Sequence, residues 1–247
     1  PNKIVLGGHG TGAYIALGYA GLDNENELYL PKFLDFTDPA NPDPYVSPTV
    51  YGNIDGTNAT YWPNMPGHPF SGLQMNIPNN PSYSSDINMA FNLGGAIPDI
   101  SWLEAGDVPI VSFHCHKDPY APIDTGDVIV PNTGDFVVEV MGSRTVQHYS
   151  NMYGNNDVFV NAGFTDAFTN AANINNDGYE GLNVFVMPAP DSVPNMFGEY
   201  YEEPASPWDW WDNTYYDAAF SGYHGAPAGY GAANSILGNP DMSAAKG

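Results

Sequence analysis

A run of small residues between a strand pattern and a helix pattern constrains this chain more than any other feature. Residues 3–6 (Lys-Ile-Val-Leu) predict a short strand, and residues 13–20 have the apolar spacing of a helix. Residues 7–12 between them read Gly-Gly-His-Gly-Thr-Gly. A strand, a tight glycine turn and a helix in this order form the unit of an α/β protein. We therefore expect an α/β fold with a mostly parallel sheet and helices on both faces.

The spacing of the glycines indicates which kind of turn this is. Dinucleotide-binding turns need the pattern GxGxxG, and residues 7–12 do not have that spacing. The five residues from Gly8 to Gly12 match the nucleophile-elbow pattern GxSxG at every position except the third, which is Gly10. Glycine has no side-chain oxygen, so this position cannot supply a nucleophile. Thr11 stands where the backbone N–H of an oxyanion hole is usually supplied.

Three segments in the same order resemble secreted bacterial α/β-hydrolases of the carboxylesterase and lipase type. Residues 3–24 are similar to the elbow and the following helix, and residues 92–96 to the next strand. Residues 102–122 are similar to the strand and turn that carry the acid of the catalytic triad. This resemblance covers roughly residues 1–160. It implies that residues 1–247 are the C-terminal part of one α/β-hydrolase-like domain.

The same resemblance assigns the positions of the triad. Gly10 takes the place of the nucleophile, and Asp118 matches the acid that orients the histidine. The histidine should follow a strand predicted at residues 157–160, and the first candidate there is Tyr179, a poor base because the pKa of tyrosine is about 10. His224 is the alternative. Without a nucleophile, the interpretation that we favour for Asp118 is a cap of its own turn.

The resemblance also concerns what surrounds the first strand. In the hydrolase fold several strands precede the elbow strand, so the N-terminal strands of that fold are absent from this chain. An unpaired central strand is avoided in natural proteins. We therefore expect residues 4–6 to pair on both sides. The expected partners are other protein chains or an upstream segment completing the sheet, in an oligomeric assembly.

The remaining patterns divide the chain into regular and irregular stretches. Proline, asparagine, glycine and aspartate are frequent in residues 22–86, which predicts an irregular, lid-like excursion, and a loop-rich tail is expected over residues 161–247. Between them we predict strands at 87–93 and 108–114, a strand or helix at 136–141, and a helix at 142–153.

One stretch imitates the start of a calcium loop. Asn173, Asn175 and Asp177 have the right spacing, but Val184 stands at the twelfth position, where a bidentate glutamate belongs. An asparagine-rich turn is the alternative. No other cofactor is expected. His114 and His116 are interpreted as turn histidines, because spacing identifies no further metal ligands for them.

Aromatic side chains are dense near residues 200–216. Trp208, Trp210 and Trp211 belong to a helix predicted at residues 208–220. Such a helix would cover the sheet. In the alternative interpretation these side chains bind sugar or protein, since aromatic residues are enriched at interfaces.

The charge of the chain excludes some partners. Five Lys and Arg residues face 28 Asp and Glu residues, which gives a net charge of −23. Such a charge is unsuited to nucleic acid and to anionic membrane surfaces. No apolar run is long enough for membrane insertion. An acidic surface is typical of proteins that stay hydrated in salt or recruit cations, so we expect a secreted, extracellular or cell-surface location.

These observations lead to one hypothesis and two alternatives. The hypothesis is a catalytically inactive hydrolase-like module, acting as a structural or binding component of an extracellular or cell-surface assembly. The first alternative is an active secreted serine esterase with an atypical nucleophile. The second is a carbohydrate-binding surface protein. Enzymatic activity is left open, with inactivity favoured.

Overall fold

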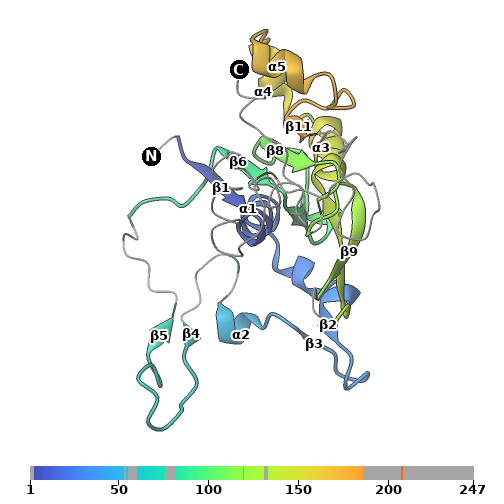
Figure 1. The fold of residues 1–247 in the computed structure, drawn as a ribbon. Coiled ribbons are helices and arrows are strands. Elements are labelled where there is room, and N and C mark those ends of the chain that lie inside the picture. Colours follow the sequence, from blue (N-terminus) through green and yellow to red (C-terminus); the bar gives the residue numbers. More distant parts are fainter. Residues whose placement is uncertain are drawn as a thin grey trace, which may run out of the picture.

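A four-stranded parallel sheet lies at the centre of the molecule (Figure 1). The computed structural model describes residues 3–52, 54, 60–75, 80, 82–118, 120–130, 133–185 and 207. The strands are ordered β1-β6-β8-β11, and their bounds are Val5–His9, Met89–Leu93, Ile110–Cys115 and Leu182–Phe185. With its helices, this sheet places the chain in the α/β class.

One face of the sheet is closed by two helices. The helices α1 (Thr11–Gly21) and α3 (Ser143–Met152) both contribute to a single core cluster with the sheet. In that cluster Leu17 of α1 and Val146 of α3 pack against the paired strand residues Ala90 and Ile110. The helices α4 (Asp157–Ala162) and α5 (Ala167–Ala172) lie above β8 and β11 in the view of Figure 1.

A second, antiparallel sheet is attached beside the first. Its order is β7-β10-β9, with bounds Ala96–Ile97, Phe136–Gly142 and Thr125–Ile129. The segment predicted as strand or helix is therefore a strand, and the helix predicted directly after it is confirmed as α3.

The described part of the predicted excursion contains only short elements. They form two small hairpins, β2-β3 and β4-β5, which extend away from the central sheet (Figure 1). The elements are η1 (Glu25–Tyr29), η2 (Pro31–Phe33), β2 (Leu34–Asp35), β3 (Asp43–Pro44), α2 (Pro48–Tyr51), β4 (Thr60–Tyr61) and β5 (Gln74–Met75), and η3 (Ile100–Trp102) follows later. No helix in the described ranges is both long and apolar enough to cross a membrane.

One prediction about the later part of the chain is wrong. Residues 157–160 are not a strand: they form the start of α4, which ends at Gly163 in the left-handed conformation. A glycine in that conformation terminates helices. The fourth strand, β11, lies instead inside the predicted loop-rich tail, where it pairs in parallel with β8.

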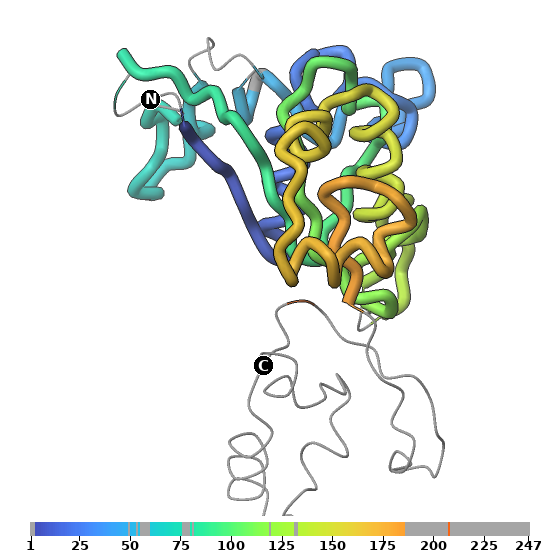
Figure 2. Tube along the Cα trace, turned by 90° about the horizontal axis from the view of Figure 1, so that it is seen from above, coloured from blue at the N-terminus to red at the C-terminus, as the bar shows by residue number. Residues whose placement is uncertain are grey.

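The first strand is an edge strand of the described fold. Among the described residues β1 pairs with β6 alone, so the expected pairing of residues 4–6 on both sides is not found there (Figure 2). The carbonyl of Ile4 accepts from Asn88, and the N–H of Gly10 donates to Leu93. The backbone N–H and C=O groups of successive strand residues point to opposite neighbouring strands. In β1 the backbone groups of the even-numbered residues therefore point toward β6. The backbone groups of Val5 and Gly7 therefore face the edge.

Candidate functional site

The carboxyl ends of three neighbouring strands meet at one edge of the sheet. Gly10 follows β1, Gly95 follows β6, and Asp118 follows β8. The N–H of Gly10 donates to the carbonyl of Leu93 across 3.0 Å, which ties the first turn to the second strand. This edge is where open parallel sheets bind ligands.

The turn at Gly10 has a backbone that other residues avoid. Its φ is 53° and its ψ is −124°. A positive φ of this kind is strained for residues with a Cβ atom. The strand and helix beside it are in close contact: a Cβ atom on Gly8 would lie 2.1 Å from the carbonyl oxygen of Gly12, and one on Gly95 would lie 2.4 Å from the Cβ atom of Ala13. Small residues are thus a steric requirement of this turn.

Asp118 is buried and caps its own turn. Its side chain is 0% exposed. The Oδ1 atom accepts hydrogen bonds from the backbone N–H groups of Tyr120, at 2.8 Å, and Ala121, at 3.1 Å. The structure thus shows the cap that the sequence favours for this residue.

Tyr14 of α1 lies close enough to Asp118 for the charge of that residue to affect its hydroxyl. Burial raises the pKa of the Tyr14 hydroxyl to about 12, and the negative charge of Asp118 contributes to this rise. The hydroxyl is buried and has no hydrogen-bond partner among the described residues. Tyr14 lies one helical turn after Gly10, so the charge of Asp118 acts on the first turn of the helix that follows Gly10.

A network of buried polar side chains runs beneath this edge. Asn92 donates to the Oγ atom of Ser112 across 2.6 Å, and these two residues are paired in β6 and β8. Gln147 of α3 donates to the same Oγ atom at 2.9 Å and accepts from Asn156 at 2.6 Å. All four residues are fully buried. Buried polar groups that are satisfied in this way favour one arrangement of the core.

His114 joins this network to the Asp118 turn. Its Nδ1 atom lies 2.7 Å from the Oγ atom of Ser143, and its Nε2 atom lies 3.1 Å from the carbonyl oxygen of Ala121. A carbonyl only accepts, so Nε2 carries the proton and Nδ1 accepts from Ser143. Burial is the main cause that lowers the pKa of His114 to about 4. The ring is therefore neutral at pH 7.

Ser143, His114 and Asp118 form a line of hydroxyl, imidazole and carboxyl groups. The Nε2 atom of His114 lies 4.0 Å from the Oδ2 atom of Asp118. The chemistry of a hydrolytic triad needs a nucleophile that a substrate can reach. Ser143 and His114 are 0% exposed. The line is therefore a structural element of the core and supplies no nucleophile.

Sequence reasoning missed Asn92 and Ser112 and interpreted His114 as a turn histidine, whereas His114 lies buried within β8. A signal was nevertheless present. Asn92, Ser112 and His114 each interrupt an apolar strand. Ser112 and His114 are two apart, so they lie on one face of β8. Polar residues at alternating positions on the core-facing side of a strand indicate a buried hydrogen-bond network.

Two other residues of the proposed site are placed as follows. Thr11 is the first residue of α1 and is exposed. Tyr179 precedes β11, whereas Asp118 follows β8, the parallel neighbour of β11. Tyr179 thus lies before the start of β11, and Asp118 lies after the end of β8. The hydroxyl of Tyr179 lies 3.1 Å from the Nδ1 atom of His148 on α3.

The residues of the calcium pattern make contacts within the protein. The Asp177 carboxylate forms an ion pair with Arg144 at 2.7 Å. The side-chain oxygen of Asn173 accepts from Asn176 at 2.8 Å. In the described ranges, no group of three or more His, Cys, Asp or Glu residues is arranged to hold a metal ion. Calcium binding through Asn173, Asn175 and Asp177 stays a prediction.

His224 and the aromatic residues Trp208, Trp210 and Trp211 lie outside the described residues. The alternative triad histidine and the aromatic binding surface therefore stay predictions.

Comparison with known proteins adds no relative. No protein-family model, no curated protein and no solved structure matches this chain.

Proposed function

We propose that this chain is a catalytically inactive module with a hydrolase-like elbow, acting as a structural or binding component of an extracellular or cell-surface assembly. The observation that carries the proposal is Gly10. It occupies a turn with positive φ, 53°, between a parallel strand and a helix, at the carboxyl edge of the sheet. A nucleophile in such a turn needs a side-chain hydroxyl or thiol, and Gly10 has neither.

The surroundings of Gly10 support a hydrolase-like origin. Gly8 and Gly95 allow the strand and helix to approach at distances that no Cβ atom permits. Asp118 lies after the third strand of the same edge, where its charge acts on Tyr14 of the helix. The steric features of an elbow are thus combined with an acid, while the attacking group is missing.

The first strand supports a role in an assembly. Val5 and Gly7 turn their backbone groups toward the edge of the sheet, and neither proline nor a charged side chain interrupts β1. Natural proteins normally block or cover such an edge. An additional strand, from an upstream segment or from another chain, would complete the sheet here.

The charge supports the proposed location. A net charge of −23 keeps a protein hydrated and apart from other anionic surfaces. This property suits a protein outside the cell in salty surroundings.

An activity assay tests the catalytic part of the proposal. The purified chain is incubated with p-nitrophenyl butyrate, and separately with a fluorophosphonate probe that labels activated serines. We expect hydrolysis at the rate of buffer alone and no labelling, because Gly10 presents no attacking atom.

If hydrolysis is observed, two variants with the same change of charge show whether it comes from the proposed site. Asp118→Asn alters the buried acid of the site, and Asp127→Asn alters an exposed residue of β9. Hydrolysis that Asp118→Asn abolishes and Asp127→Asn preserves would show a working active site and overturn the proposal.

A further inference from the structure

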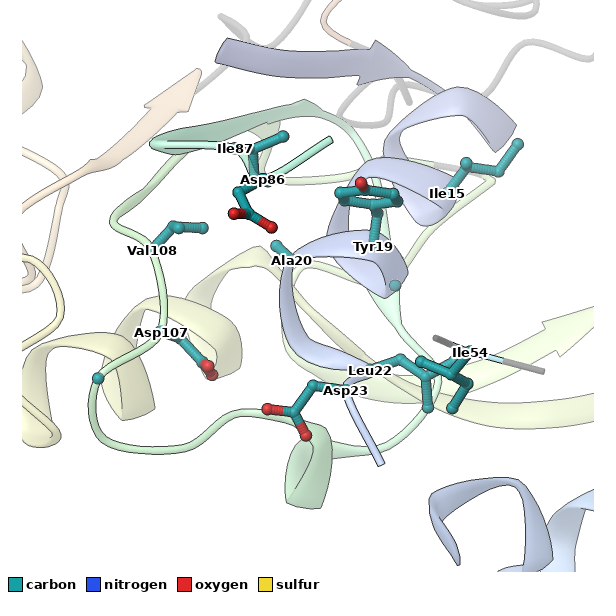
Figure 3. A pocket seen from close by; sticks show the side chains of 12 residues that line it. Ile15, Tyr19, Ala20, Leu22, Asp23, Ile54, Asp86, Ile87, Asp107 and Val108 are labelled. Atoms are coloured by element: carbon teal, nitrogen blue, oxygen red, sulfur yellow. The ribbon is translucent and has the colours of Figure 1, made fainter. Parts of the chain in front are cut away.

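A cavity of about 680 Å³ lies at the end of the sheet opposite to Gly10 (Figure 3). Its walls come from Ile54, from the second half of α1 with the two residues after it, and from the segments that lead into β6 and β8. These segments precede their strands, whereas Gly10 and Asp118 follow theirs. The cavity is therefore separate from the proposed site, and an inference about it does not rest on the proposed function.

The walls of the cavity are largely apolar. Ile15 and Tyr19 of α1 line one side of the cavity, and Ile87 and Val108, just before β6 and β8, line the other side. Ile15 is 67% exposed and Tyr19 is 51% exposed, so the apolar surface continues to the mouth of the cavity. The hydroxyl of Tyr19 donates to the carbonyl of Ser85 at 2.8 Å, which holds this ring in place. A volume of this size is typical of sites for small organic ligands.

Three carboxylates are set among these apolar walls. They belong to Asp23, Asp86 and Asp107, and Figure 3 shows Asp23 and Asp107 pointing toward one another. The pKa of Asp107 is raised to about 6, mainly by burial, and the nearby charges of Asp23, Glu104 and Glu27 contribute to the rise. None of the three aspartates forms an ion pair with a described residue, and Lys32 pairs instead with Asp99. The cavity thus concentrates negative charge that no cation of the described chain balances.

The arrangement of the three aspartates favours an organic cation over a metal ion as the ligand. A metal ion needs several oxygen ligands around one point. The described residues contain no such group. An organic cation places its charge near one or two carboxylates and its carbon atoms against apolar walls. The cavity offers both surfaces side by side.

We propose that this cavity binds an organic cation with an apolar body, namely an alkyl or aryl ammonium or guanidinium group. The charge is held between Asp23 and Asp107, with Asp86 nearby. The apolar body packs on Ile15 and Tyr19. Such a group occurs both in free amines and in basic side chains of a protein partner.

Calorimetric titration with matched probes tests this proposal. Phenethylamine, which is cationic at pH 7.5, is compared with phenethyl alcohol, a neutral molecule of nearly the same shape. Acetyl-Leu-Arg-Leu-amide is compared with the same peptide carrying citrulline in place of arginine. We expect each cationic probe to bind and each neutral one to fail. Tighter binding of the amine assigns the site to free amines, and tighter binding of the peptide assigns it to a partner's side chain.

Variants locate the binding. Asp107→Asn should lower the affinity for the cationic probe by about fivefold or more, as expected for a partly buried charge pair. Asp127→Asn removes the same charge from an exposed position on β9. This variant should therefore bind the cationic probe with the affinity of the unchanged protein. Bound amine should also lower the pKa of Asp107, followed by the carboxyl carbon in NMR, so that binding weakens as the pH falls below about 6.

Three outcomes would overturn the proposal. The first is equal binding of phenethylamine and phenethyl alcohol, which would show an apolar pocket without charge recognition. The second is equal loss of affinity in Asp107→Asn and Asp127→Asn. The third is displacement of the amine by equimolar Ca²⁺, which would show a metal site.

Discussion

At Gly8 the backbone of β1 touches the backbone of α1, and this contact leads to the first prediction. A Cβ atom there would lie 2.1 Å from the carbonyl oxygen of Gly12 and 2.7 Å from the backbone nitrogen of Ala13. Neither atom belongs to a flexible side chain, so the helix itself would have to move. We expect Gly8→Ala to lower the free energy of unfolding by about 3 kcal/mol or more, measured by urea denaturation.

Gly12 provides the matched control four residues later. A Cβ atom on Gly12 meets nothing within 4 Å, and this residue is already helical. Gly12→Ala should therefore raise the free energy of unfolding by about 0.5–1 kcal/mol, because alanine loses less backbone entropy in a helix. Equal effects of the two substitutions would contradict the close contact of β1 and α1.

His114 leads to a prediction about pH. Its pKa is about 4 in the folded protein, because the ring is buried, and about 6.5 in an unfolded chain. Between these values the unfolded chain binds the proton more readily. The stability that His114 contributes is therefore complete above pH 6.5 and is lost as the pH falls toward 4, by roughly 3 kcal/mol in total.

Two histidine variants isolate this contribution. The unfolding free energy of the His114→Gln variant should fall less steeply between pH 7 and pH 5 than that of the unchanged protein. His116→Gln, at an exposed position in the next turn, should keep the original slope. The explanation fails if His114→Gln keeps that slope as well.

Among the secondary-structure elements, β1 allows a direct test of whether its outer edge is unpaired. Its even-numbered residues bond to β6, whereas Val5 and Gly7 face the edge. Hydrogen exchange followed by NMR should therefore show slow exchange at the amides of Leu6 and Gly8 and fast exchange at those of Val5 and Gly7. Addition of a strand would slow the last two. Slow exchange of all four in the isolated chain would mean that the edge is already covered.

The elements also show what could be predicted from sequence. The strands β1, β6 and β8 and the helices α1 and α3 were predictable, because each carries its apolar pattern within a short stretch of chain. The strand β11 was not, since four residues give too short a pattern and pairing with β8 defines it. In α4 the residues Val158, Phe159 and Val160 have strand-like side chains, but the turn that ends at Gly163 favours a helix.

The candidate site was predictable in part for a similar reason. Gly10 and Asp118 belong to short motifs that follow strands, and strand ends of a parallel sheet meet at one edge. The polar network is different, because its members are far apart in the chain. Asn92 and Ser112 are separated by 20 residues and meet only through the register of β6 and β8.

At the scale of the whole molecule, self-repulsion dominates the electrostatics. A net charge of −23 on 247 residues opposes the compact state, and dissolved ions screen such repulsion. We expect the melting temperature to rise between 10 mM and 500 mM NaCl, and to rise equally in KCl. A melting temperature that is insensitive to both salts would show that the carboxylates are too widely spaced to repel each other.

The glycine at position 10 has a consequence for the balance between stability and activity. A side chain in that backbone conformation costs of order 1–3 kcal/mol, and glycine avoids this cost. Active enzymes accept such strain because the reacting group has to stand there. In this chain the same turn is relaxed. A variant that carried a hydroxyl at this position would begin with a less stable fold, and would need compensating stabilisation elsewhere before catalysis could be selected.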